Sequence, residues 1–324
     1  MKALFVTCVL AVNCAASATA TAQTYPSRPI TIVVPFAAGG PTDTLARIMS
    51  EPMRKLLGQT VLVENVTGAG GTIALGRVVR AAPDGYTMGI GHWGSHVVSG
   101  AYYTLPFNLL TDFDPVAMIA SNPQVIVSNL AVPAKNLKEL IAWSKANQEK
   151  LLVGTGGVAA SAHMGGIYFQ NAIGAKFQFV HYRGGAPAVQ ALLGGEVNLY
   201  VTQVTGAVPL VRAGKIRAYA VTANTRQAAA PDIPTVDEAG LPGLHTSVWH
   251  AFWTPKGVAK DINAKLNAAI IESLADATVR KRFADLGQEI PAREGLTPQA
   301  LAAFHKAEIE KWWPLIKAAG LKAQ

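Results

Sequence analysis

The chain has 324 residues, of which half are hydrophobic and only 15% are charged. This composition excludes a disordered chain, and the length exceeds what one hydrophobic core usually supports, so we expect two domains. The formal net charge is +8, but the lysines and arginines are spread singly with no basic run, which disfavours nucleic acid as a partner.

Residues 1–22 have the pattern of a cleaved secretory signal. An apolar run at residues 4–12 is followed by Ala20-Thr21-Ala22, an A-x-A cleavage site. The apolar run is too short to span a membrane. Cys8 and Cys14 both lie in the segment expected to be removed. We therefore expect an exported, cysteine-free mature protein without disulfides or a Cys-ligated metal.

Residues 30–45 predict a strand, a glycine turn and a helix start in succession. The β-branched run ITIVV is typical of a strand buried on both faces, residues 37–40 form a tight turn, and Pro41, Thr42 and Asp43 suit the first turn of a helix. This arrangement directs backbone N–H groups and the positive end of the helix dipole at one point. It therefore favours an anion without needing a cationic side chain.

Strands and helices alternate along the rest of the chain. After the first helix, which ends at Gly58, we expect strands at residues 60–66, 86–91, 151–154, 176–182, 198–204, 216–223 and 245–253, and helices at 72–82, 136–146, 160–173, before 193, before 213 and three times after 253. The segment 113–129 holds two apolar runs, which we expect to be broken at Asn122-Pro123. This alternation predicts a mostly parallel α/β sheet that is built twice.

The chain is expected to leave the first domain near Asn122 and to return near Ala223. This gives a discontinuous first domain of residues 23–123 and 224–324, and a second domain of residues 124–223. Two crossing segments form a hinge, and the strand-end turns of both domains then face each other across a cleft.

Four strand-to-helix turns are rich in glycine, at residues 37–40, 68–71, 154–157 and 184–185. A single turn of this kind uses glycine for tight geometry without any ligand. Four turns, two in each domain, favour a cleft for a polar ligand. Several must converge, because an anion at one helix start gains only ~0.3–1 kcal/mol.

The run Gly154–Ala159 also fits the dinucleotide-binding pattern G-x-G-x-x-A. That use needs an acidic residue about 20 positions further on to hold the ribose. No Asp or Glu occurs between Lys150 and Gly195. We therefore exclude a dinucleotide and expect no cofactor.

His92 and His96 have the i, i+4 spacing of helical metal ligands. No third ligand lies nearby, and Trp93 and Gly94 between them suit a loop, so we expect a structural or ligand-contacting role and no metal. Ser161 stands at a helix start, where a cap or a ligand donor is a better interpretation than a nucleophile. The sequence contains no G-x-S-x-G elbow and no Walker loop.

Three side chains keep two interpretations each. Arg183 precedes Gly-Gly and fits either a ligand carboxylate or nearby backbone carbonyls. Trp249 lies in an aromatic-rich strand, which is typical of core packing, with a ligand-facing edge as the alternative. His163, two residues after Ser161, fits either a structural or a ligand-contacting role.

Blocks of sequence along nearly the whole mature chain carry a family pattern. They are YPSRPITIVVPFAAGGPTD, VENVTGAGGTIALG, APDGYT, Gly94-Ser95-His96, DFDPV, VGTGG with Ser161 and His163, YRGGAPA, LLGGEV, RAGKIRAYAVT, DIPTVDEAGLPG, and the late Glu308 with Trp312. In this order they resemble the Bug family, the periplasmic solute-binding proteins of tripartite tricarboxylate transporters.

The resemblance implies an α/β Venus-flytrap fold of the type II periplasmic binding-protein kind, with two domains and the ligand in the interdomain cleft. It also implies that backbone amides and ordered waters of the strand-end loops hold a ligand carboxylate, and that no residue is catalytic. With the residue reasoning above, the expected ligand-binding residues are Phe36, Ala37, Ala38, Gly39, Gly40, Thr42, Asp43, Gly70, Gly71, His92, Trp93, Ser95, Thr155, Gly156, Ser161, Gly185, Ala186, Thr202, Gln203 and Trp249.

The chain departs from the family pattern at two places. Thr202 and Gln203 stand where many relatives have an Asp in the strand leading into Pro209. His92 and Trp93 stand where relatives often have small hydroxyl side chains. An Asp could bind an amine, so its absence favours a purely anionic or aromatic carboxylate over an amino acid.

We therefore expect a monomeric periplasmic receptor that captures a di- or tricarboxylate, or an aromatic carboxylate. It would deliver this ligand to the membrane permease subunits of a tripartite transporter, without catalysis. Two alternatives stay open. One is a co-receptor that presents the ligand to a periplasmic sensor kinase. The other is an exported hydrolase, for which the sequence supplies no nucleophile–base pair that we can assemble.

Overall fold

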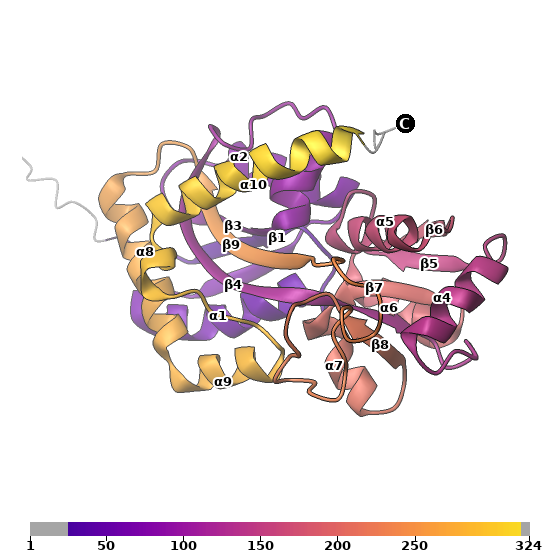
Figure 1. Ribbon diagram of the computed structural model, residues 1–324. Helices are drawn as coiled ribbons and strands as arrows, with labels where there is room; N and C mark the ends of the chain where they lie inside the picture. Colours follow the sequence, from indigo (N-terminus) through magenta and orange to yellow (C-terminus); the bar gives the residue numbers. More distant parts are fainter. Residues whose placement is uncertain (1–24, 319–324) are drawn as a thin grey trace, which may run out of the picture.

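The computed structural model describes residues 25–318 and shows two α/β halves side by side (Figure 1). The expected signal sequence at residues 1–22, with both cysteines, lies outside the described residues. None of the described helices is both long enough and apolar enough to cross a membrane.

The first half contains the N-terminal strands and helices and the C-terminal third of the chain. Its N-terminal elements are β1 (Ile30–Val34), α1 (Pro41–Leu57), β2 (Val61–Asn65), η1 (Ala69–Gly71), α2 (Thr72–Val79), β3 (Thr87–His92), η2 (Gly94–Val98), α3 (Ser99–Tyr102) and β4 (Phe113–Ser128). Its C-terminal elements are β9 (Ser247–Pro255), α8 (Lys260–Ala275), α9 (Ala277–Asp285), η3 (Arg293–Leu296) and α10 (Pro298–Ala318).

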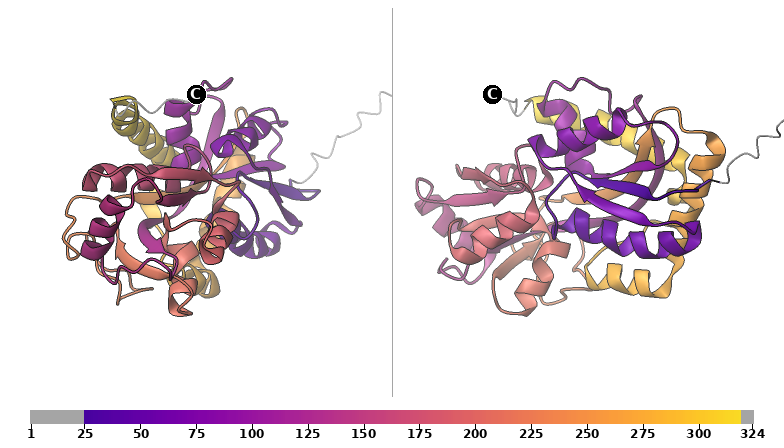
Figure 2. Two further views of the ribbon diagram at one scale, coloured as in Figure 1. Left: turned by 90° about the vertical axis from the view of Figure 1, so that its right-hand side faces the viewer. Right: turned by 180° about the vertical axis from the view of Figure 1, so that it is seen from behind.

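The second half is formed by the middle of the chain. Its elements are α4 (Leu137–Ala146), β5 (Leu152–Thr155), α5 (Ser161–Ile173), β6 (Gln178–His181), α6 (Gly185–Gly194), β7 (Leu199–Gln203), α7 (Val204–Arg212) and β8 (Arg217–Val221). Viewed from behind, this half lies beside the N-terminal strands and α1 (Figure 2, right).

One nine-stranded sheet runs through both halves in the order β2-β1-β3-β9-β4-β7-β5-β6, with β8 also paired to β4. In the first half β1 is parallel to β2 and β3, and in the second half β5 is parallel to β6 and β7. The long strands β4 and β9 are antiparallel to their neighbours. The expected parallel arrangement is therefore found in the strands whose ends carry the glycine turns.

The strand β4 links the two halves. The expected break at Asn122-Pro123 is wrong, because β4 continues through both residues. It pairs with β9 up to Pro123, and with β7 and β8 beyond that residue. Proline cannot donate to a β ladder, so it is tolerated where the strand exchanges one set of partners for another.

The first half has three layers (Figure 1). On one face of its sheet, α1, α8 and α9 bury apolar side chains such as Leu45, Met49 and Phe283. On the other face, α2 and α10 pack against the sheet, where Val78 of α2 and Trp253 of β9 are buried in one apolar cluster. Burying a large apolar side chain contributes about 1.5–3 kcal/mol. The strand-end loops therefore project from a well-packed block.

The segment 222–246 packs with the second half and does not return at once to the first. Val236 is buried with the apolar cluster beneath α4 and α5, and Ile233 with the cluster beneath α6 and α7. β9 then carries the chain back from Ser247 onward. We therefore propose that the second crossing lies at Ser247 and not at Ala223.

The expectation of a loop at residues 92–96 is also wrong. The backbone of Trp93 is already helical, with φ −41° and ψ −45°, and the π-helical turn η2 follows it and continues into α3. Trp93 and Val97 are buried in the apolar cluster that includes residues of α10. This burial outweighs the poor helix propensity of Gly94.

Candidate functional site

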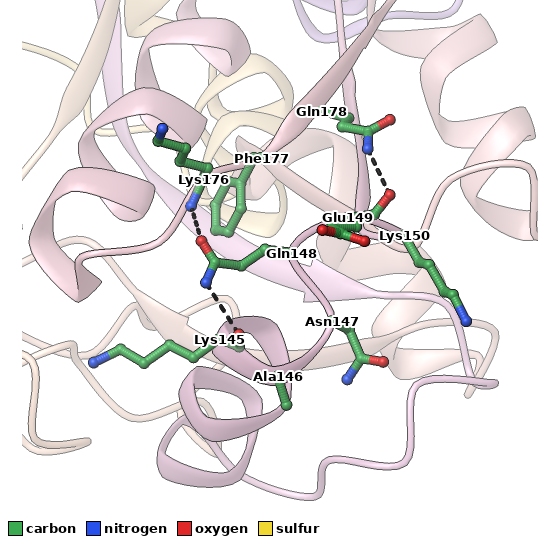
Figure 3. Close-up of a pocket in the computed structure, with 9 residues that line it drawn as sticks. All are labelled: Lys145, Ala146, Asn147, Gln148, Glu149, Lys150, Lys176, Phe177 and Gln178. Atoms are coloured by element: carbon green, nitrogen blue, oxygen red, sulfur yellow. Dashed lines mark hydrogen bonds between the residues drawn. The ribbon is translucent and has the colours of Figure 1, made fainter.

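A hollow of about 610 Å³ lies where α4 ends beside the loop that enters β6. Figure 3 shows the amines of Lys145, Lys150 and Lys176 extending in different directions. The amides of Gln148 and Gln178 are bonded to backbone groups. Because the polar groups that line this hollow do not converge, it lacks the arrangement that fixes a small ligand.

A smaller cavity of about 30 Å³ lies between the two halves. It is lined by Phe36, Pro41, Thr42 and His92 of the first half and by Gly156, Ala160, Ser161, Ala162, Gly185, Tyr200, Thr202 and Gln203 of the second. This volume holds roughly two water-sized groups, which suits the head group of a ligand. None of the lining residues is a lysine, arginine, aspartate or glutamate.

Four helices begin at this cavity. The lining includes Pro41 at the start of α1, Ala160 just before α5, Gly185 at the start of α6 and Gln203 just before α7. The first N–H groups of a helix have no partner inside the helix, and the aligned peptide dipoles give each start a partial positive charge. The cavity is therefore electropositive although it contains no cationic side chain.

Backbone donors remain unused at these helix starts. Within residues 25–318, no backbone acceptor is bonded to the N–H groups of Thr42, Ser161, Ala162 or Gly185. An anion in the cavity can accept hydrogen bonds from donors of both halves at once. These unused N–H groups are the feature of the site that most favours an anion.

The turn at residues 37–40 uses most of its backbone donors within the protein. The N–H of Ala37 donates to the carbonyl of Arg183 in the other half at 3.1 Å, and the N–H of Gly40 donates back to the carbonyl of Ala37 at 3.4 Å. The N–H of Gly39 donates to the Asp43 carboxylate at 2.8 Å. Three of its four N–H groups are thus bonded to protein.

Asp43 supports this turn. Its carboxylate also accepts hydrogen bonds from Arg47 at 2.9 Å and from Asn65 at 2.9 Å. Burial alone would raise the pKa of Asp43, but the hydrogen bonds from Arg47, Gly39 and Asn65 together hold it below its ordinary value. Asp43 is therefore ionised and fully engaged by the protein.

Two neutral histidines lie at the wall of the first half, and His92 is the one that lines the cavity. The ring of His92 stacks on Phe36 with centroids 4.6 Å apart, and its Nδ1 accepts the N–H of Gly94 at 2.8 Å. Burial lowers the pKa of His92 to about 3. We therefore assign a neutral ring with its proton on Nε2. Nε2 of His250 lies 3.2 Å from Oγ1 of Thr42, and burial lowers the pKa of His250 well below its usual value.

Strand β7 contributes three residues to the wall of the second half, namely Tyr200, Thr202 and Gln203. Tyr200 and Thr202 are two residues apart in this strand, so they share the face that meets the cavity. Burial raises the pKa of Tyr200 to about 12, which keeps the phenol neutral. Oε1 of Gln203 is buried and has no hydrogen-bond partner among the described residues. An unsatisfied buried oxygen of this kind costs about 1–3 kcal/mol.

A second cavity, of about 240 Å³, adjoins the first, because Phe36 and Gly156 line both. Gly70 and Gly71 of the first half and Arg183 of the second also line it. The part of a ligand beyond its head group therefore has room beyond Phe36.

The two halves touch around these cavities. The hydroxyl of Tyr103 donates to the carbonyl of Val158 across the cleft at 3.3 Å. A Cβ atom added to Gly70 would lie 2.5 Å from the same carbonyl oxygen, and one added to Gly40 would lie 3.6 Å from the nitrogen of Gly185. The structure therefore describes the closed arrangement of the cleft.

Three expected ligand contacts lie away from both cavities. The indole of Trp249 donates to Glu308 at 3.0 Å in a groove beside the hinge. Side chains alternate along a strand, so Trp249 points to the face opposite its neighbour His250. Trp93 is buried in the core with residues of α10, and Ser95 Oγ is bonded within its own turn.

Other expected residues surround the site without lining the smaller cavity. Oγ1 of Thr155 lies 2.7 Å from Nδ1 of His181, which braces the loop after β5. Nδ1 of His163 accepts the N–H of Ala159 at 3.1 Å, and burial lowers the pKa of His163 to about 4. Ala38 is exposed on the turn after β1. Gly39 faces Ala186 of the other half, since an added Cβ would lie 3.7 Å from that side chain.

Eight of the expected residues are brought together at the smaller cavity: Phe36, Thr42, His92, Gly156, Ser161, Gly185, Thr202 and Gln203. The cavity also has four lining residues that the sequence reasoning missed, namely Pro41, Ala160, Ala162 and Tyr200. Strand alternation could have found Tyr200, because it stands two residues before Thr202. Within residues 25–318 no group of three or more His, Cys, Asp or Glu is placed to hold a metal ion.

The structure has two α/β halves, two chain crossings and a small polar cavity enclosed between the halves. These features define a class of protein. They are the features of a solute-binding protein of the Venus-flytrap kind, in which domain closure buries the ligand.

The sequence profile of the tripartite tricarboxylate transporter family receptor matches residues 45–321. The chain belongs to this family. The expected resemblance to the Bug family and the expected fold class are confirmed by this match and by the structural similarities.

Three similar proteins illustrate the relationship. The "UPF0065 protein in the TAR-I ttuE-ttuC' intergenic region" of Agrobacterium vitis is 40% identical over 92% of this chain and 86% of its own length. The periplasmic binding protein BugD has a TM-score of 0.89 and 39% identity, covering 92% of this chain and 100% of BugD. MatC from Rhodopseudomonas palustris, solved with bound malate, has a TM-score of 0.87 and 38% identity, covering 90% of this chain and 100% of MatC.

Proposed function

We propose that this protein captures a small carboxylate in its interdomain cleft and delivers it to the permease subunits of a tripartite tricarboxylate transporter. The observation that carries the proposal is the meeting of four helix starts, from both halves, at one cavity without a charged side chain. Such a site binds negative charge through backbone N–H groups and helix dipoles. The family membership and the malate bound to the relative MatC support it.

The proposed mechanism couples binding to closure. The unused N–H groups of Thr42 and Ser161 belong to different halves. A carboxylate that accepts from both lies between the halves and stabilises their contact. Since the ligand binds the closed arrangement better than an open one, it shifts the population toward closure. The closed form is then the signal that a membrane partner can recognise.

The compartment and the partners belong to the same proposal. We propose export to the periplasm, guided by the expected signal sequence at residues 1–22, and action as a monomer. A sensor kinase is the alternative partner for the same binding event. Co-transcription with genes for a membrane permease or for a sensor kinase distinguishes the two.

The geometry favours binding over hydrolysis. Ser95 Oγ and His96 Nδ1 lie 3.1 Å apart, which is the spacing of a nucleophile and its base. Both side chains are buried, and neither lines the two interdomain cavities. Ser161 does line the cavity, but His163 is engaged through Nδ1 by Ala159. Neither serine therefore has both a base and access to a substrate.

A thermal-shift screen followed by calorimetry tests the proposal. The ligands are mono-, di- and tricarboxylates, terephthalate and nicotinate, and each is matched with its neutral amide as a control. A ligand that binds only the native state stabilises it by about 2.7 kcal/mol at 100 times its Kd. We expect at least one carboxylate to raise the melting temperature while its amide does not. If amides stabilise the protein as well as carboxylates, the site does not bind through charge and the proposal is wrong.

A further inference from the structure

A groove of about 520 Å³ lies against the two strands that link the halves, and we call it the hinge groove. It is lined by Pro123 of β4 and by Ser247 and Trp249 of β9, at the point where these strands pair. Side chains alternate along β9, so Trp249 faces the groove while His250, which contacts Thr42, faces the cleft. The hinge groove and the ligand cleft therefore lie on opposite sides of the same hinge.

Each half supplies one wall of the hinge groove. Phe304, Glu308 and Trp312 come from α10 of the first half. The facing wall is the segment 222–227, of which Ala223 packs with the apolar cluster beneath α6 and α7 of the second half. A rotation about the linking strands that closes the cleft moves these two walls apart. In the closed arrangement that the structure describes, the hinge groove is therefore open.

The carboxylate of Glu308 is held in a set position in this groove. Its Oε2 accepts the indole N–H of Trp249 at 3.0 Å and that of Trp312 at 3.2 Å. Its Oε1 makes no hydrogen bond to the residues that the structure describes. The exposed Glu289 lines the same groove. An oriented carboxylate with an unused oxygen is an acceptor for a cationic donor.

Aromatic rings flank this carboxylate. Phe304 and Trp312 stand one helical turn on either side of Glu308, so the three side chains share one face of α10. The ammonium of Lys311 lies 4.9 Å from the centroid of the Trp312 ring, which shows that this ring can carry a cation. The other basic residue that lines the groove, His245, is already bonded to an aspartate at 2.8 Å. The groove thus suits a positive charge on a partly apolar body.

A buried amide on the other wall gives a second and independent indication of a ligand. Gln227 lines the hinge groove and is only 5% exposed. Its amide group makes no hydrogen bond to any residue between 25 and 318, although amides buried to this degree normally have a partner. The second half therefore offers an unused hydrogen-bonding group across the groove from α10.

We propose that the hinge groove binds a small organic cation, an ammonium or guanidinium group on an apolar body, and that the bound cation holds the cleft closed. The charge lies against Glu308, and the body lies between the rings of α10 and the segment 222–227. A molecule that fills the groove keeps its walls apart and so opposes opening of the cleft. It therefore raises the affinity of the cleft for its ligand, and by linkage that ligand raises the affinity for the cation by the same factor.

Calorimetry tests the site directly, first without any carboxylate. The probes are benzamidine and phenylguanidine, which are cations at neutral pH, and their neutral isosteres benzamide and phenylurea. We expect at least one cation to bind at millimolar concentration or below, and its isostere at least about 10-fold more weakly, because the charge-assisted bond to Glu308 is lost. If neither cation binds, or if the isosteres bind as well as the cations, the proposed site is wrong.

Matched variants of α10 locate the cation. Glu308→Gln removes the charge but keeps an oxygen for the two indole N–H groups, and it should weaken the cation at least about 10-fold. Glu310→Gln is the control, since Glu310 is exposed on the same helix and does not line the groove. Melting curves establish that both variants fold. Equal effects of the two variants would place the cation elsewhere and overturn the inference.

The coupling to the cleft has a definite sign. A saturating amount of the tighter-binding cation should strengthen binding of the carboxylate found by the thermal-shift screen by about 5-fold or more. Thr225→Trp fills the groove from its second wall and should also strengthen carboxylate binding. Ala228→Trp is the control, because Ala228 is exposed in the same segment but does not line the groove. A gain in affinity is not the result expected from a damaged fold.

Two further results overturn the inference and leave the proposed function intact. Weaker carboxylate binding in the presence of the cation would place the cation in the cleft, and unchanged binding would mean that the groove is not coupled to the hinge. Failure of every carboxylate to bind is a different result, because it removes the proposed function alone. Small-angle scattering then decides the coupling, since the cation by itself should contract the protein, and no contraction at saturation would refute it.

Discussion

The two walls of the cleft have the same architecture and different chemistry. In both halves parallel strands end in glycine turns, and helices begin where the strands end. The first half brings one helix start, that of α1, together with the neutral ring of His92. The second half brings the starts of α5, α6 and α7 with small side chains around them. We therefore propose that the second wall supplies most of the charge recognition, because three of the four helix starts belong to it.

The difference extends to the buried histidines. Among the described residues the first half buries His92, His96, His250 and His305, while the second half buries His163. Desolvation by burial is the main cause that lowers the pKa of each of these groups. The first half thus buries four imidazoles that stay uncharged, and the second half buries one.

The largest expected effect follows from this contrast. Since the folded pKa values lie below the unfolded value of about 6.5, the unfolded chain binds more protons below that pH, and stability falls as the pH decreases. Each buried neutral histidine adds to this loss. The first half has four such residues, so between pH 7 and pH 5.5 it should lose more stability than the second half, where burial lowers the pKa of His163 and His181. Backbone hydrogen exchange, compared between the two halves and corrected for intrinsic rates, measures the stability that each half loses. An equal loss of stability in both halves would contradict the conclusion that buried neutral histidines are concentrated in the first half.

A second prediction separates cleft closure from local backbone strain. Gly70 and Gly174 have nearly the same left-handed backbone, with φ +63° and +64°. A Cβ on Gly70 would meet the Val158 carbonyl oxygen of the other half at 2.5 Å, whereas one on Gly174 meets nothing within 4 Å. Both alanine variants should lose about 1 kcal/mol of stability. Only Gly70→Ala should also lose affinity, by about 30-fold, because its side chain opposes closure.

Calorimetry and small-angle scattering check this pair. Ligand should contract the unmodified protein and Gly174→Ala, and should contract Gly70→Ala less. If Gly70→Ala binds and contracts as well as Gly174→Ala, ligand binding does not require the closed contact that the structure describes.

The smallest effect is expected at Arg183. Arg183 lines the larger cavity and not the smaller one, and its carbonyl already accepts the N–H of Ala37. Arg183→Ala keeps that carbonyl, so affinity for a carboxylate should fall by less than about 5-fold. Loss of a direct bidentate ion pair would cost much more. Calorimetry with the tightest-binding carboxylate decides, and a 100-fold loss would move the anion site to the guanidinium.

Local sequence patterns were sufficient for the elements that carry the site. The run ITIVV, the turn that follows it and Pro41 predict β1, a tight turn and the start of α1, and the structure has all three. These features depend on neighbours in the sequence: a buried β-branched strand and a proline whose missing N–H has no partner at a helix start. The same reasoning placed Ser161 and Gly185 at helix starts.

The features that were missed depend on contacts between distant segments. Alternation along β9 separates Trp249 from His250, but only the packing of α10 decides which face is the core and which is the cleft. The N–H of Ala37 is used by Arg183, which lies in the other half. Strand β4 passes through Pro123 because its partners change there. None of these contacts has a local signal in the sequence.

A crystal structure of the complex with the tightest-binding carboxylate tests the central claim most directly. Our account predicts that the carboxylate oxygens lie about 2.7–3.2 Å from the backbone nitrogens of Thr42 and Ser161, one from each half. It also predicts that the guanidinium of Arg183 is not bonded to that carboxylate. A carboxylate paired with Arg183, or bound outside the cavity where the four helices begin, would contradict the account.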